Sequence, residues 1–96
     1  MPFPQHELEL KALAADRIRQ NLLPARSPKA VWAGPGSGER CSLCDQTIDE
    51  LETEYEIDPP MATLNRVVRL HLRCHTLWHL EVARLTRARA ARGAPV

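Results

Sequence analysis

The sequence predicts a small α+β domain that needs a bound metal ion to complete its fold. The chain has 96 residues, which is room for one domain, but only 4% of them are aromatic. Chains of this size bury a modest part of their surface and often depend on a metal or on disulfides. All three cysteines stand in short paired spacings. Alternating and helical patterns on either side of these pairs predict strands and helices around the site.

Residues 5–23 predict an amphipathic N-terminal helix. Its apolar residues recur at helical spacing on one face: Leu10, Leu13, Ala14, Ile18 and Leu22. Pro24 ends the helix, because proline has no backbone N–H to donate. We expect the apolar face to pack on the rest of the domain, and a helix that binds a partner is the alternative.

Residues 24–40 are rich in Pro, Gly and Ser, show no period, and predict a linker. Val31 and Trp32 interrupt it, and we expect this apolar pair to dock on the domain; an aromatic exposed for a partner is the alternative. The stretch 34–38 (GPGSG) lacks the Gly-Lys-Ser/Thr ending of a phosphate-binding loop. It predicts a flexible approach to the first cysteine pair.

Residues 53–58 and 66–72 predict the two strands of a β-hairpin. Apolar residues and threonine alternate with charged residues and histidine along both: Thr53, Tyr55 and Ile57, then Val68, Leu70 and Leu72. Pro59 and Pro60 cannot donate to a strand ladder and belong to the connection. Cross-strand Glu–Arg pairs should favour the hairpin mildly.

Residues 73–92 predict a second helix. Its inward stripe comprises Cys74, Leu77, Trp78, Val82 and Leu85. Beyond Leu85 the composition is mostly Ala and Arg, which favours a helix but offers little to bury. The end of the chain is therefore predicted to be an Arg-rich helix.

Two paired motifs predict one structural zinc site with Cys41, Cys44, His71 and Cys74 as ligands. The first is a C-x2-C pair and the second an H-x2-C pair, and the predicted hairpin joins them. Zinc prefers four thiolate or imidazole ligands in a tetrahedron. Residues three apart at the start of a helix share a face, so both pairs can aim at one point.

Two points stay open at this site. His75 or His79 could replace His71, although both should face elsewhere on the helix. A Cys-rich tetrahedron also accepts iron. The odd number of cysteines argues against a disulfide framework. The sequence shows neither a signal peptide nor an apolar span, which predicts a protein of the reducing cytoplasm without a membrane partner.

The predicted coordination argues against an enzyme. Catalytic zinc sites usually keep one position open, whereas three Cys and one His fill the tetrahedron. Neither an H-E-x-x-H motif nor a zinc-deaminase signature is present. We therefore expect a binding protein without a small-molecule substrate.

Knuckle, hairpin and helix in this order describe a treble-clef zinc module over residues 41–92. The stretch 41–78 resembles the poly(ADP-ribose) polymerase-type finger, which recognises DNA breaks, and the first half of a LIM domain, which binds proteins; Ile48 and Trp78 fit the polymerase-type packing. The whole layout resembles a group of small uncharacterised bacterial treble-clef proteins. This resemblance rests on Leu-Pro at 23–24, the Trp-x-Gly-x-Gly-Ser-Gly lead-in at 32–38, the C-x2-C pair, the Glu-rich strand and the H-x2-C helix. It implies a fold and a metal, but no activity.

Charge is distributed unevenly along the chain, although the net charge is only +1. Residues 41–60 carry seven acids and no Lys or Arg, and residues 61–96 carry seven Arg against one acid. The candidate partner surfaces are Glu52, Glu54 and Glu56, and Arg84, Arg87, Arg89 and Arg92. The overall balance favours a small regulatory or adaptor module with a protein partner. Nucleic-acid binding by the Arg-rich helix is the alternative, and self-association through the two surfaces is a variant.

Overall fold

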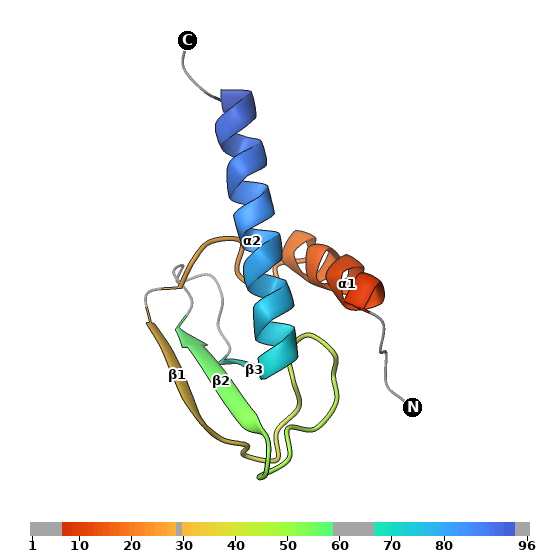
Figure 1. Ribbon diagram of the computed structural model, residues 1–96, viewed down its shortest axis with the longest axis vertical. Coiled ribbons are helices and arrows are strands. Elements are labelled where there is room, and N and C mark those ends of the chain that lie inside the picture. Colours follow the sequence, from red (N-terminus) through yellow and green to blue (C-terminus); the bar gives the residue numbers. More distant parts are fainter. Residues whose placement is uncertain (1–6, 29, 59–66, 94–96) are drawn as a thin grey trace.

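The computed structural model describes residues 7–28, 30–58 and 67–93. The elements are α1 (Glu7–Arg19), β1 (Ala30–Pro35), β2 (Thr53–Asp58), β3 (Val68–His71) and α2 (Leu72–Gly93). Helix α2 starts against the sheet, passes α1, and extends beyond the body at its C-terminal end (Figure 1). Neither helix, over the described residues, has the length and apolarity required to cross a membrane. The architecture is therefore a small α+β fold, as the sequence predicts.

The three strands form one antiparallel sheet in the order β1-β2-β3. The predicted hairpin is confirmed: Ile57 of β2 pairs with Val68 of β3. Alternate side chains of these strands lie in the core against α2, where Trp78 is 0% exposed. The predicted connection at residues 59–65 lies outside the described residues.

Helix α1 ends earlier than predicted, at Arg19 and not at residue 23. Asn21 adopts a left-handed φ of 61°, and the Leu22 amide donates to the Arg17 carbonyl at 2.8 Å. Asn tolerates this conformation, which closes a helix end by satisfying its last carbonyls. The turn stops the helix before Pro24 is reached. Leu10, Ala14 and Ile18 are buried, so the predicted packing of the apolar face on the domain is confirmed.

The predicted linker at residues 24–40 is wrong over its central part, because Ala30–Pro35 forms β1 and pairs with β2. The sequence shows no alternation there because nearly all of β1 is exposed, so neither face selects for apolar residues. Val31 and Trp32 are 39% and 56% exposed, so the expected docking of this pair is also wrong. The stretch that follows is not a free approach either: the amides of Gly36 and Gly38 donate to Glu52 and Ile48 carbonyls.

Strand β3 gives way to α2 at Leu72, where the sequence pattern continued the strand. Leu72 is 55% exposed, because the change from strand to helix turns its side chain out of the alternation. The predicted stripe of α2 is confirmed. Its first four members, Cys74, Leu77, Trp78 and Val82, are buried, and Leu85 is partly buried against them. The core therefore sits between the sheet, α1 and the first half of α2.

Candidate metal centre

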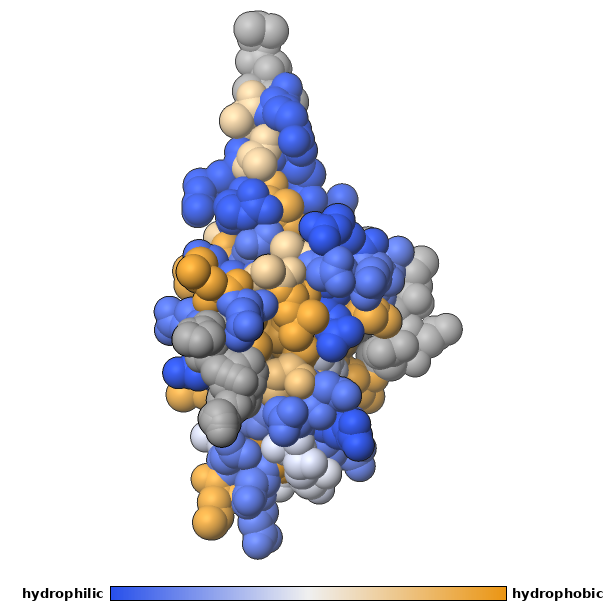
Figure 2. All heavy atoms as spheres, turned by 90° about the vertical axis from the view of Figure 1, so that its right-hand side faces the viewer, coloured by the Kyte–Doolittle hydropathy of each residue, from blue (hydrophilic) through white to orange (hydrophobic). Residues whose placement is uncertain are grey.

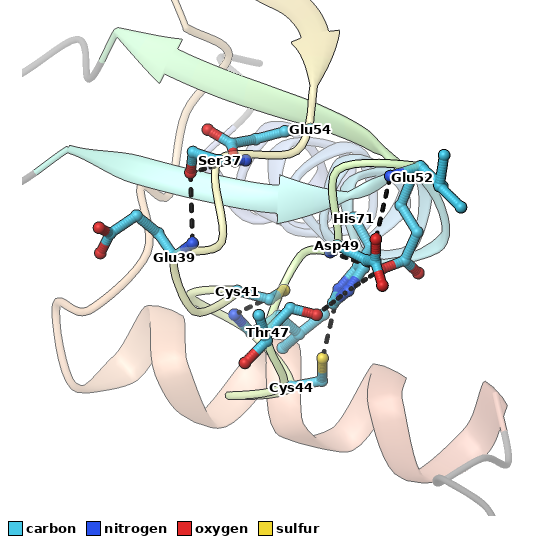
Figure 3. Close-up of polar contacts among 11 residues, drawn as sticks. Ser37, Glu39, Cys41, Cys44, Thr47, Asp49, Glu52, Glu54 and His71 are labelled. Carbon is cyan, nitrogen blue, oxygen red and sulfur yellow. Dashed lines mark hydrogen bonds and ion pairs between the residues drawn. The ribbon is translucent and has the colours of Figure 1, made fainter.

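The structure brings the four predicted ligands together. The ligand atoms of Cys41, Cys44, His71 and Cys74 all lie within 4.8 Å of one another. Two come from the loop before β2, one from the end of β3 and one from the first turn of α2, and Figure 3 shows the first three converging. A tetrahedral zinc ion would hold its ligand atoms roughly 3.3–3.8 Å apart. A small closure of these side chains would therefore surround a metal ion.

The loop of residues 41–46, called the knuckle below, is shaped by its own backbone. The Cys41 amide donates to the Gln46 carbonyl at 2.8 Å, and the Asp45 amide donates to the Cys41 carbonyl at 2.9 Å. Asp45 adopts a φ of 66°, which Asp tolerates better than most residues. The Leu43 amide points at the Cys41 sulfur at 3.4 Å. This turn aims two sulfurs to one side while the Leu43 side chain enters the core.

Contacts distant in sequence hold the knuckle against β3 and α1. The Ser42 amide donates to the Arg69 carbonyl at 2.7 Å, and the Arg69 amide donates to the Ser42 hydroxyl at 3.2 Å. From α1, the Arg17 guanidinium donates to the Leu43 carbonyl at 3.3 Å. The two ligand pairs are therefore positioned by hydrogen bonds as well as by any metal.

His71 is held in one orientation. Its Nδ1 lies 3.5 Å from the Cys44 sulfur, and its Nε2 lies 3.2 Å from the Thr47 carbonyl oxygen. A carbonyl can only accept, so Nε2–H donates to Thr47 and Nδ1 keeps its lone pair for a metal. The Glu52 carboxylate lies 3.6 Å from Nε2 and supports the same tautomer. Sequence reasoning could not find Thr47, because a backbone carbonyl leaves no signal in residue type.

Without a cation, this arrangement disfavours ionisation of all three thiols together. Hydrogen bonds from the Cys44 and Cys74 thiols lower the pKa of Cys41 far below its usual value. The same contacts with the Cys41 sulfur raise the pKa of Cys44 and of Cys74. A divalent ion would replace the shared protons and allow every sulfur to bind as thiolate. The donor set therefore fits a metal ion.

His75 and His79 lie outside this cluster. The His75 ring stacks on Tyr55 with centroids 4.6 Å apart and an interplanar angle of 19°. His79 lies one turn further along α2, with its ring centroid 6.2 Å from that of His75. Partial burial lowers the pKa of His75, and repulsion from His79 adds to this. The predicted choice of His71 over these two residues agrees with the structure, whereas the stacking of His75 on β2 was not anticipated.

The three glutamates of the candidate acidic surface have different environments. Glu54 is buried, at 7% exposure, and accepts hydrogen bonds from the Ser37 amide and hydroxyl at 2.9 and 2.7 Å. Its other oxygen lies 3.1 Å from Arg69 Nε, which makes the expected Glu–Arg pair between strands. Glu52 lies beside His71, and Glu56 is half-buried. Only part of the predicted acidic surface is therefore available to a partner.

The four arginines of the candidate basic surface are all exposed on the second half of α2. Figure 2 shows this part as a narrow column of mainly hydrophilic residues above the body. Arg84 pairs with the Glu81 carboxylate at 2.6 Å, and Arg89 reaches the Ala25 carbonyl at 3.4 Å. The arrangement can present positive charge to a partner.

A hollow of about 530 Å³ opens beside the metal-ligand cluster. Its lining comprises Gln46, Thr47, Glu52, Thr53, His71, Leu72, Arg73 and Cys74. It borders His71 and the first turn of α2, so it belongs to the same region of the molecule as the candidate metal centre. Comparison of the chain with protein-family models, curated proteins and solved structures gave no match.

Proposed function

We propose that this chain is a treble-clef-like module stabilised by one structural zinc ion, and that it acts by binding another protein. The observation that carries the proposal is the cluster of three cysteines and one histidine within 4.8 Å. Four such ligands complete a tetrahedron, and three thiolates make zinc a weak Lewis acid. The metal would then serve the fold, and catalysis is not part of the proposal.

The order of elements supports the treble-clef-like assignment. A knuckle supplies Cys41 and Cys44, a β-hairpin follows, and the hairpin runs directly into a helix whose first turn supplies Cys74. His71 is the last residue of the hairpin. Helix α1 and strand β1 are additions to this unit, and α1 contributes Ala14 and Ile18 to a core that would otherwise be smaller.

The outer strand of the sheet supports protein binding over other functions. Val31 and Trp32 of β1 are exposed, and Trp is among the residues that contribute most at protein interfaces. The side chain of Trp32 offers apolar area, and the edge strand that carries it offers unpaired backbone N–H and C=O groups. The metal would hold the sheet that presents this strand.

The metal part of the proposal is tested by native mass spectrometry of the full chain purified without added metal. We expect one zinc ion per chain, and a folded chain that carries no metal would refute this part of the proposal.

The binding part is tested by capture from a cell extract with the wild-type chain and with a Val31→Ser, Trp32→Ser variant. We expect specific proteins to be lost with the variant. Capture of no protein by the wild-type chain would count against protein binding.

A second candidate, nucleic-acid binding, is favoured by the exposed arginines at the projecting end of α2. Each phosphate contact releases a counterion, so binding should weaken steeply with salt. Duplex and single-stranded DNA should be measured at two salt concentrations, with a variant carrying Ala at positions 84, 87, 89 and 92. If this candidate holds, the slope of log binding constant against log salt concentration becomes shallower in the variant by up to about 3–4, since each phosphate contact contributes ~0.9. No binding of the wild-type chain at low salt removes it.

A further inference from the structure

The outer edge of β1 is open. In the strand order β1-β2-β3, one side of β1 pairs with β2, and no other described segment pairs with its opposite side. The equivalent edge of β3 is occupied at Arg69, where Ser42 makes two hydrogen bonds. An open edge displays backbone N–H and C=O groups that can pair with an added strand.

A hollow lies on this edge because of Gly34. In the register, Trp32 lies opposite Glu56 and Gly34 lies opposite Glu54, so these four residues share one face of the sheet. A Cβ built on Gly34 meets nothing within 4 Å. The missing side chain leaves a space of about 170 Å³. Its lining comprises Trp32, Ala33, Gly34, Pro35, Glu54 and Glu56.

The lining selects for positive charge. Two of its side chains are carboxylates, and a third is an indole that is 56% exposed. Ser37 and Arg69 already satisfy Glu54, whereas Glu56 makes no hydrogen bond or ion pair within the described part of the chain. A Lys or Arg side chain beside an indole face gains a cation–π interaction as well as its attraction to the carboxylate. An acidic side chain would be repelled.

We propose that β1 receives an extended segment of a partner protein as a fourth strand, and that a Lys or Arg of this segment fills the hollow over Gly34. Directly opposed residues of paired strands have Cβ atoms ~4.5–5.5 Å apart, and diagonal neighbours remain within reach of long side chains. A cation opposite Gly34 would therefore extend over the glycine, with Trp32 diagonal to it on β1 and the carboxylates of Glu54 and Glu56 on the next strand, β2. This inference rests on the proposed protein-binding function and specifies its partner.

The test measures peptide binding to the full, metal-loaded chain by isothermal titration calorimetry. The probes are blocked pentapeptides of alternating Thr and Val with a central Lys, and matched peptides with central Glu or Met. We expect the Lys peptide to bind at least about fivefold more tightly than the Glu peptide, from the combined cation–π and surface ion-pair contributions. Equal binding of the Lys and Glu peptides would overturn the proposal.

Three variants locate the binding on β1. Gly34→Leu places an apolar side chain in the hollow, where a Cβ meets nothing within 4 Å, and Trp32→Leu and Glu56→Gln remove the indole and the charge respectively. Each should reduce the preference for Lys over Glu, and Gly34→Leu should abolish it. Leu80→Ala is the matched control, because Leu80 is 51% exposed on α2. Circular dichroism confirms that each variant is folded, and unchanged Lys preference in all three folded variants contradicts the inference.

Two results distinguish failure of strand addition at β1 from failure of the proposed protein binding. If the wild-type chain and Gly34→Leu capture the same proteins from an extract, protein binding stands but this edge is not the site. If the chain forms dimers that Gly34→Leu abolishes, and no peptide binds, a second copy occupies the edge and the proposal fails. Sedimentation over a range of concentrations detects this second result.

Discussion

The two edges of the sheet have opposite characters. The edge of β3 is closed by the knuckle, through hydrogen bonds between Ser42 and Arg69, and it ends at His71 in the ligand cluster. The edge of β1 is uncovered within the described residues, and it carries exposed Val31 and Trp32. One edge is committed to the fold, and the other is the edge that we propose for a partner. The candidate metal centre and the candidate binding surface therefore lie on separate parts of one small sheet.

The residues on the two edges account for this difference. Val68 and Leu70 of β3 are 0% exposed, so this strand contributes apolar area to the core. Strand β1 is exposed at five of its six residues and depends mainly on its ladder with β2. Changes at the closed edge should therefore alter stability, and changes at the open edge should alter binding.

The largest effect is expected on removing the metal from the closed edge. Structural zinc contributes an apparent ~10–16 kcal/mol in finger peptides, compared with ~5–15 kcal/mol for the net stability of a whole domain. Excess chelator, or Cys74→Ser, should therefore unfold the knuckle, the sheet and the start of α2. The measurements are circular dichroism and the thermal midpoint, with His79→Ala as the matched control outside the cluster. An unchanged midpoint in chelator, with no metal bound, would show that the fold does not need the metal.

The two tryptophans give the next largest contrast. Trp78 is 0% exposed and its indole N–H donates to the Pro24 carbonyl at 2.8 Å, so Trp78→Ala should cost about 3–5 kcal/mol. Trp32 is 56% exposed, and Trp32→Ala should change stability by no more than about 0.5 kcal/mol. Urea unfolding of the metal-loaded chain measures both. Similar losses for the two variants would mean that β1 belongs to the core after all.

Two glycines test the same contrast on a smaller scale. At Gly36 a Cβ would collide with the backbone of Asp49 and would come within 2.7 Å of the Ile48 carbonyl oxygen, so Gly36→Ala should cost about 1–3 kcal/mol. At Gly34 a Cβ meets nothing within 4 Å. Gly34→Ala should be neutral, or stabilising by up to about 1 kcal/mol, because glycine is unfavourable inside a strand. The difference in urea midpoint between the two variants is the measurement, and the reverse order would contradict the described geometry.

The smallest effect is expected at Glu81, which lies on neither edge. Its hydrogen bonds with Arg84 lower the pKa of this carboxyl below its usual value, and Lys11 and Arg19 of α1 add to the effect. Because this pKa is lower in the folded protein, the ionised carboxylate adds to the free energy of unfolding. This stabilisation is fully present above the usual carboxyl pKa and is lost as the pH falls through the pKa of the folded state. The thermal midpoint of Glu81→Gln should therefore lie slightly below that of the wild type at pH 7. The difference in thermal midpoint between the two proteins should become smaller at acidic pH. A difference that grows at acidic pH would contradict this prediction.

Local patterns in the sequence were sufficient for several elements. The bounds of β2 and the buried stripe of α2 follow from periodicity, because burial against one side leaves an alternating or helical signature. The four clustered ligands follow from paired spacing, because the knuckle directs Cys41 and Cys44 to one point and the junction of β3 with α2 directs His71 and Cys74 there. These features depend on residues within a few positions of one another.

The remaining features depend on residues far apart in the chain, and only the tertiary structure decided them. Strand β1 exists because β2 offers it a ladder, although its own sequence has no strand period. Glu54 is buried because Ser37 and Arg69 satisfy its charge, whereas alternation alone placed it in solvent. His71 presents Nδ1 to the cluster because Nε2 faces the Thr47 carbonyl. Spacing alone thus determined which residues gather at the candidate metal centre, but long-range pairing determined which edge of the sheet stays open.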